Sequence, residues 1–210
     1  MQEQEPKLPA DFWDSLTDGV SIESVLPSKS YNEVRGKIKT GDVLLFRSRD
    51  WYTGLFLVSG RSEYCHAAMA GWWGNRLMCV EMTFDGGRAQ LLSNVVNQYP
   101  GTCDVYKANA SRRKFNREAA LHAMLEITGR PYGYWTLFKA SWVHLPIIRW
   151  FVRADVDDKE STAMPFCSAA VSAACRAGGV DPVPNLADRA TEPGDLARSA
   201  FFKGMFTLVP

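Results

Sequence analysis

A cysteine at the expected start of a helix is the first candidate for chemistry in this sequence. Cys167 follows Pro165 by two positions and precedes an alanine-rich stretch that ends at Gly178 and Gly179. Proline is common at the first helical position, so the pattern places Cys167 in the first turn, where unpaired N–H groups and the helix dipole favour a thiolate. The same N–H groups can stabilise an oxyanion. Cys167 is therefore a candidate nucleophile, and a small buried packing residue is the alternative.

A histidine and a glutamate occupy a predicted β-hairpin. Strand-like runs over 66–73 and 76–83 are separated by Gly74-Asn75, which suits a two-residue turn. With that turn, Glu81 lies diagonally beside His66 on one side of the sheet, roughly 7 to 8 Å away between backbones and within side-chain reach. Glu81 shares its face with apolar residues and needs a partner. A carboxylate-held imidazole and a solvated hairpin edge with an ordinary histidine and glutamate explain this pattern equally well.

Other catalytic signatures are missing from the sequence. It contains no phosphate-binding glycine loop, no dinucleotide fingerprint, no H-E-x-x-H and no G-x-S-x-G. The three histidines, His66, His122 and His144, fall in separate predicted elements, so a histidine-rich metal site is hard to assemble. We therefore expect no metal site and no cofactor, and nucleophilic cysteine chemistry remains.

Composition restricts the partners and the compartment. The 210 residues are 46% hydrophobic and 22% charged, as in a globular protein, and the formal net charge of +1 provides no overall field for a nucleic acid backbone. Five cysteines without a C-x-x-C motif argue against a disulfide framework or a zinc knuckle and favour free thiols. The first thirty residues are acidic and contain no apolar run of signal-peptide length. We expect a cytoplasmic protein, or a periplasmic or secreted one if a leader was removed.

The elements that must position these residues follow from hydrophobic pattern and capping signals. The pattern of residues 1–40 predicts a helical appendage with a short helix over 31–38. We expect residues 41–210 to form the catalytic domain. The remaining expected elements are strands over 43–46, 89–92, 104–107 and 205–209, and helices over 49–59 and 116–128, the latter capped by Asn116.

The most apolar stretch of the chain spans residues 134–152. Lys139, His144, Pro146 and Arg149 interrupt it, which argues against a membrane-spanning helix. The segment fits a core helix, a pocket lid or an interfacial segment that contacts lipid at a membrane surface.

Six short motifs follow one another along the chain: Gly41-Asp42, Tyr64-Cys65-His66, Val80-Glu81, Gly129-Arg130-Pro131-Tyr132, Phe166-Cys167-Ser168 and Glu192-Pro193-Gly194-Asp195-Leu196. Taken in this order, they resemble the circularly permuted branch of the NlpC/p-sixty papain-like superfamily, often called YiiX-like. The resemblance spans roughly residues 41–196, and the order of histidine, acid and cysteine is the permuted one.

The resemblance implies an α+β, circularly permuted papain-like (NlpC-type) fold with an antiparallel sheet packed against helices. It implies that Cys167 attacks a carbonyl, that His66 is the general base and acid, and that Glu81 orients the imidazole. Tyr132, Tyr64 and Trp142 are then the expected substrate-binding residues, and no metal or cofactor is required.

Three functions remain open at this point. The first is a cysteine peptidase or amidase that cleaves a cell-wall (peptidoglycan) peptide or a related small peptide or acyl amide through a thioester. The second is a lipid-directed thiol acyltransferase or phospholipase on the same scaffold, with residues 134–152 against the membrane. The third is a non-catalytic binding module that retains the fold.

Overall fold

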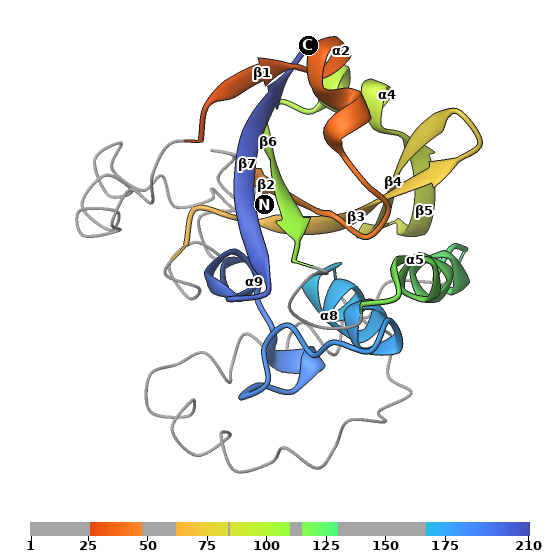
Figure 1. Cartoon of the computed structure of the whole chain (residues 1–210), viewed down its shortest axis with the longest axis vertical. Helices are drawn as coiled ribbons and strands as arrows, with labels where there is room; N and C mark the ends of the chain where they lie inside the picture. Colours follow the sequence, from red (N-terminus) through yellow and green to blue (C-terminus); the bar gives the residue numbers. More distant parts are fainter. Residues whose placement is uncertain (1–25, 48–61, 84, 110–114, 130–166) are drawn as a thin grey trace, which may run out of the picture.

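The computed structural model describes residues 26–47, 62–83, 85–109, 115–129 and 167–210 (Figure 1). The helix expected over 49–59 and the apolar stretch over 134–152 lie outside the described residues.

A seven-stranded mixed sheet forms the centre of the molecule. Its strands, in spatial order, are β1 (Ser28–Ser30), β7 (Phe202–Val209), β6 (Thr102–Ala108), β2 (Val43–Arg47), β3 (His66–Trp73), β4 (Arg76–Thr83) and β5 (Gly86–Leu91). β1 is parallel to β7, and every other neighbouring pair in this sheet is antiparallel. The predicted α+β class is confirmed, whereas the expectation of a purely antiparallel sheet is wrong at the β1–β7 pair.

Helices cover both sides of this curved sheet. On one side lie α5 (Arg117–Glu126), α8 (Cys167–Ala177) and α9 (Pro193–Arg198), and on the other lie α2 (Tyr31–Val34) and α4 (Leu92–Gln98) (Figure 1). Two short 3₁₀ helices, η1 (Arg35–Lys37) and η2 (Asp188–Ala190), continue α2 and precede α9. Within the described residues, no helix is long and apolar enough to cross a membrane.

The continuous apolar run of β2 follows from burial on both faces. Val43 and Leu45 belong to the hydrophobic cluster that contacts α5 and α8, whereas Leu44 and Phe46 belong to the cluster on the other face. Because side chains alternate along a strand, a strand covered on both faces is apolar throughout. The run predicts a buried strand for this reason.

The predicted hairpin register is present in the structure. Trp73 pairs with Arg76 and Ala68 pairs with Glu81, and Gly74 adopts a positive φ of 58° in the turn. A one-residue slip would move every side chain of β4 to the opposite face. This register therefore decides which residues share a face with His66.

Residues 28–38 contribute a strand to the sheet and a short helical segment that covers one of its faces. β1 pairs with β7, and Tyr31, Val34 and Ile38 are buried in the cluster below α2 and α4. These contacts join the described part of the predicted appendage to the sheet. Residues 1–25 lie outside the described residues, and the division into 1–40 and 41–210 as a whole stays a prediction.

The first turn of α5 is capped as its sequence predicts. The Asn116 side chain accepts a hydrogen bond of 3.1 Å from the Ala119 N–H, which is one of the unpaired donors of the first turn. We expect Asn116→Ala to lower the free energy of unfolding by about 1 kcal/mol, measured by urea denaturation. Asn116→Asp keeps an acceptor at the same place and should unfold close to the wild type. Equal loss in both variants would contradict the capping role.

Candidate active site

His66 and Glu81 are hydrogen-bonded at one end of the hairpin. The distance between His66 Nε2 and Glu81 Oε2 is 2.7 Å. The Glu81 side chain is 4% exposed, whereas that of His66 is 21% exposed. The imidazole also packs against the Phe46 ring, with 5.3 Å between centroids. The diagonal relation predicted from the hairpin therefore produces a direct contact, and the carboxylate among apolar neighbours has the partner that its burial requires.

Cys167 is the first residue of α8 and lies against the start of β3. Its thiol is hydrogen-bonded to the His66 side chain, whose Nε2 is bound to Glu81. The backbone N–H groups of Ala67 and Ser168 also reach the Cys167 sulfur. A sulfur beside an imidazole and two backbone N–H groups at a helix N-terminus is in an environment suited to an anion.

The pKa values of the three groups depend on one another. Burial opposes ionisation of Cys167, but the charge and hydrogen bond of His66 outweigh burial and lower the pKa of the thiol. Burial likewise disfavours the charged imidazole, but the Cys167 sulfur and then Glu81 raise the pKa of His66 to about 10. For Glu81, burial is outweighed by the hydrogen bond and charge of His66 and by Arg88, and the pKa falls to about 2. The arrangement thus favours thiolate, imidazolium and carboxylate together.

The other thiols differ from Cys167 in their surroundings. Cys79, Cys103 and Cys175 are buried, and burial raises the pKa of each well above that of an ordinary thiol. Cys65 is partly exposed, and its sulfur donates to the Phe46 carbonyl oxygen at 3.3 Å. Unlike Cys79, Cys103 and Cys175, Cys167 has its pKa lowered by a neighbouring imidazole.

The second oxygen of Glu81 is held by two residues of β5. Arg88 Nε and Gln90 Nε2 each donate to Glu81 Oε1 at 2.8 Å. The sequence pattern does not single out either residue as part of the site, because it predicts that this strand begins at residue 89. In the structure β5 begins at Gly86 and places Arg88 directly opposite Glu81. Polar residues at every second position, 88 and 90, are the signal that could have identified this face.

Two serines of α8 connect the cysteine helix to the segment that follows it. Ser168 Oγ donates to the Thr191 carbonyl oxygen at 2.6 Å, and Ser172 Oγ donates to Asp188 Oδ1 at 2.8 Å. Asp188 also forms an ion pair with Arg176 one turn further along α8. The sequence pattern predicts an alanine-rich helix but none of these contacts. They fix the rotation of α8 about its axis and hence the direction of the Cys167 side chain.

Of the three predicted substrate-binding residues, the structure describes Tyr64. Tyr64 is buried, and its hydroxyl donates to Asp104 Oδ2 at 2.7 Å and lies 2.9 Å from the Tyr106 hydroxyl. A substrate contact through this hydroxyl would have to compete with these bonds. Tyr132 and Trp142 lie outside the described residues, as does the stretch over 134–152 on which the lipid-directed alternative depends. Their roles stay predictions.

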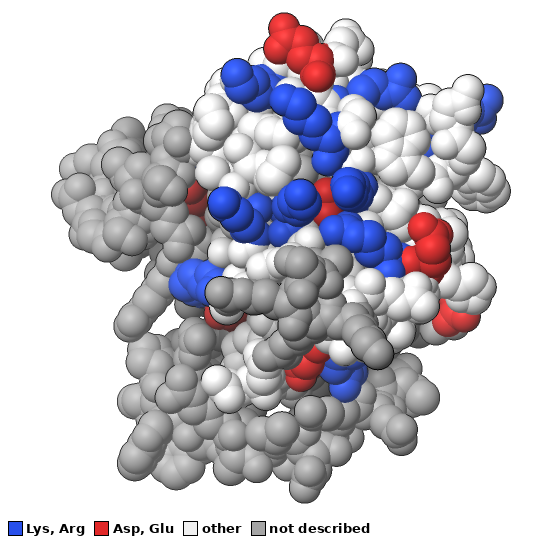
Figure 2. All heavy atoms as spheres, viewed as in Figure 1, with Lys and Arg blue, Asp and Glu red and all other residues white. Residues whose placement is uncertain are grey.

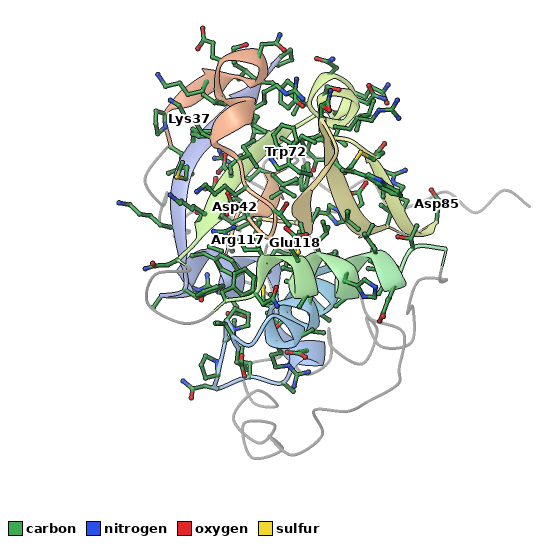
Figure 3. The ribbon with its side chains drawn as sticks, turned by 45° about the vertical axis from the view of Figure 1, so that its right-hand side comes forward. Lys37, Asp42, Trp72, Asp85, Arg117 and Glu118 are labelled. Atoms are coloured by element: carbon green, nitrogen blue, oxygen red, sulfur yellow. The ribbon has the colours of Figure 1, made fainter. Side chains whose placement is uncertain are left out.

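The Gly41-Asp42 motif has a structural role. Asp42 is 1% exposed, and its carboxylate accepts hydrogen bonds from the Lys39 and Ala108 N–H groups and from Arg117 Nη1, at 2.9, 3.1 and 2.9 Å. Figure 3 shows Asp42 and Arg117 side by side where α5 meets the sheet. The motif therefore joins the start of β2, the end of β6 and the start of α5.

The near-zero net charge is unevenly distributed over the surface. Figure 2 shows Lys and Arg side chains gathered on the face that displays α2 and β7 in Figure 1. Exposed lysines on β1, η1 and β7 include Lys29, Lys37 and Lys203. Lys107 and Lys203 are opposite one another in neighbouring strands, a like-charge pair that costs stability. The expected lack of nucleic acid binding stays a prediction that rests on overall charge.

Comparison with known proteins found a solved structure with a similar fold but no matching protein family. No protein-family model matches the sequence, and no curated protein matches it. Among solved structures, the chain is similar to the crystal structure of the metalloprotein YiiX from Escherichia coli O157:H7. The TM-score is 0.58 at 12% sequence identity, over 82% of this chain and 99% of that one. This likeness supports a common fold.

The description of that relative as a metalloprotein raises the question of a metal in this chain. Among the described residues, no group of three or more His, Cys, Asp or Glu side chains is placed to hold a metal ion. The nearest set, Cys167, His66 and Glu81, forms a row in which the imidazole separates sulfur from carboxylate, instead of converging on one point. The described residues therefore do not fit a metal centre.

Proposed function

We propose that this protein is a cysteine hydrolase that cleaves an amide bond through a thioester intermediate. The observation that carries the proposal is the hydrogen-bonded row of Cys167, His66 and Glu81, in which the sulfur lies at the start of a helix. A base beside a thiol, oriented in turn by a carboxylate, is the arrangement that activates a nucleophilic cysteine. The cell-wall peptide substrate stays an expectation from the resemblance.

The proposed reaction starts from the thiolate–imidazolium pair. The Cys167 sulfur attacks the carbonyl carbon, the carbon–sulfur bond forms, and the carbonyl oxygen becomes an oxyanion that the backbone N–H of Cys167 stabilises. His66 then donates its proton to the leaving amine as the carbon–nitrogen bond breaks, which leaves the acyl group on sulfur. In the second half, neutral His66 removes a proton from water, the resulting hydroxide attacks the thioester, and the carboxylic acid departs as the thiolate is restored.

We further propose that the fold is a circularly permuted papain-like one. His66 and Glu81 lie on the hairpin in the first half of the chain, and Cys167 follows in the second half, which is the permuted order of histidine, acid and cysteine. The likeness to the YiiX structure over 82% of this chain supports the same proposal.

Alkylation with iodoacetamide over a pH series tests the nucleophile without a known substrate. Because His66 lowers the pKa of Cys167, the thiolate is present below the pH of about 8.5 at which an ordinary thiol is half ionised. We expect mass-spectrometric mapping to show Cys167 labelled at about pH 6 at least tenfold faster than Cys65.

Two further results decide the interpretation of the labelling experiment. His66→Ala should shift the labelling of Cys167 to alkaline pH, since the neighbouring positive charge is removed. Cys79, Cys103 and Cys175 should stay unlabelled in the folded protein, because all three are buried with raised pKa values. Equal labelling of all five cysteines, or a Cys167 profile unchanged by His66→Ala, would overturn the proposal.

A further inference from the structure

The Glu81 carboxylate accepts more hydrogen bonds than are needed to orient His66. Oε2 accepts from His66, and Oε1 accepts from both Arg88 and Gln90 of β5. One donor on Oε1 would suffice to keep the carboxylate from rotating. The two donors differ in charge, because the Gln90 amide is neutral and the Arg88 guanidinium is positive.

The sheet register places these two donors on the same face as Glu81. Arg88 is directly opposite Glu81 in the β4–β5 pair, and Gln90 is opposite Cys79, two residues earlier on β4. Both side chains therefore reach Glu81 from the side away from His66. The Arg88 side chain is 51% exposed, whereas that of Glu81 is 4% exposed. Glu81 therefore lies between the half-exposed Arg88 charge and His66, bonded to both.

We propose that Arg88 and Gln90 are positioning residues that act on His66 through Glu81: Gln90 fixes the carboxylate, and Arg88 offsets part of its negative charge. Glu81 then stabilises the charged form of His66 less strongly, so that the imidazolium can release its proton to the leaving amine. This inference deepens the proposed function and rests on it for its catalytic meaning, but the effect on His66 exists in the folded protein regardless of the reaction.

The groups around His66 and Glu81 define what else could alter this balance. Cys167 faces the imidazole from α8, and Glu81 faces it from β4. Glu81 in turn is near Arg88 of β5 and the thiols Cys79 of β4 and Cys103 of β6. Both of these thiols have raised pKa values and stay neutral, so Arg88 is the positive charge on the far side of Glu81.

The test measures the pKa of His66 directly, by NMR titration of its ring protons in the Cys167→Ser protein. This background removes the thiolate and leaves Glu81 as the acidic partner of the imidazole. Replacing Arg88 by methionine should raise the pKa of His66 by roughly 0.5 to 1 unit, because the charge that weakens Glu81 is gone. Arg88→Lys keeps the charge and should stay within about 0.2 unit of the reference.

Gln90→Met is the matched neutral control. It also removes one hydrogen bond to Glu81 Oε1 but no charge, so its shift should be less than half of that in Arg88→Met. In the enzyme with Cys167 restored, the alkaline limit of turnover of 4-nitrophenyl acetate should move upward further in Arg88→Met than in Gln90→Met. Equal shifts in Arg88→Met and Gln90→Met, or no shift in Arg88→Met, would overturn the inference. A shift of His66 in a protein that shows no turnover would instead overturn the proposed function and leave the effect of Arg88 established.

Discussion

Replacement of Cys167 by serine is expected to reduce turnover of an activated acyl substrate such as 4-nitrophenyl acetate at least about a thousandfold. A serine hydroxyl at this position stays protonated, because its pKa is far above that of a thiol and His66 cannot hold it as an anion. The charged nucleophile is then lost while the helix and its hydrogen bonds to Thr191 and Asp188 are retained. Turnover is measured by release of 4-nitrophenol, and the acyl-enzyme is measured by intact mass after rapid acid quenching.

Cys65 provides the control for this experiment within the same protein. It precedes His66 directly, and its sulfur donates to a backbone carbonyl oxygen, a bond that a serine hydroxyl can replace. Cys65→Ser should therefore retain turnover within about threefold and still form the acyl-enzyme. Retained turnover in Cys167→Ser, or an equal loss in the two variants with both proteins folded, would remove Cys167 from the role of nucleophile.

Replacement of Asp42 by alanine is expected to lower the free energy of unfolding by about 3 to 5 kcal/mol. The carboxylate is 1% exposed and receives three hydrogen bonds that join β2, β6 and α5. The Arg117 side chain is 19% exposed, and without Asp42 its guanidinium loses its ion partner. The Ala108 N–H also loses the carboxylate oxygen that accepts its hydrogen bond inside the protein. Urea denaturation followed by circular dichroism measures the change.

A double-mutant cycle separates the ion pair from the backbone bonds. Arg117→Met in the Asp42→Ala protein removes the uncompensated charge, so the double variant should be more stable than the sum of the two single changes by at least about 1 kcal/mol. Additive losses would show that the two side chains are not coupled. A loss below about 1 kcal/mol in Asp42→Ala alone would contradict the junction role assigned to this residue.

Local patterns predicted the parts of the fold that depend on short-range rules. The Gly74-Asn75 turn fixed the register of β3 and β4 and brought Glu81 to His66, and Asn116 caps α5 as its residue type indicates. The proline and alanine pattern likewise predicts a helix with Cys167 in its first turn, and α8 (Cys167–Ala177) is that helix, although Pro165 lies outside the described residues. Each of these features involves residues close in sequence, where turn and capping chemistry decide the outcome.

Features that depend on distant segments could not be predicted in the same way. Gly87 reads as a turn residue, yet it lies in β5, where a Cβ atom would come within 2.0 Å of the Ile127 carbonyl oxygen at the end of α5. The glycine is required by this close backbone approach, which no local pattern reveals. The sequence pattern predicts Leu92 at the end of a strand, whereas this residue begins α4. The parallel pair β1–β7 joins the two ends of the described chain. Burial against distant elements decides all three.

The base and its carboxylate share one hairpin, whereas the sulfur arrives on a separate helix, and this separation has a consequence during synthesis. The hairpin closes through short-range contacts, which generally form early, so the imidazole–carboxylate pair can exist before the later helix has left the ribosome. Until α8 docks against β3, its thiol has no cation beside it and reacts like any free cysteine. The lowered pKa of the Cys167 thiol is thus acquired only when α8 docks against β3.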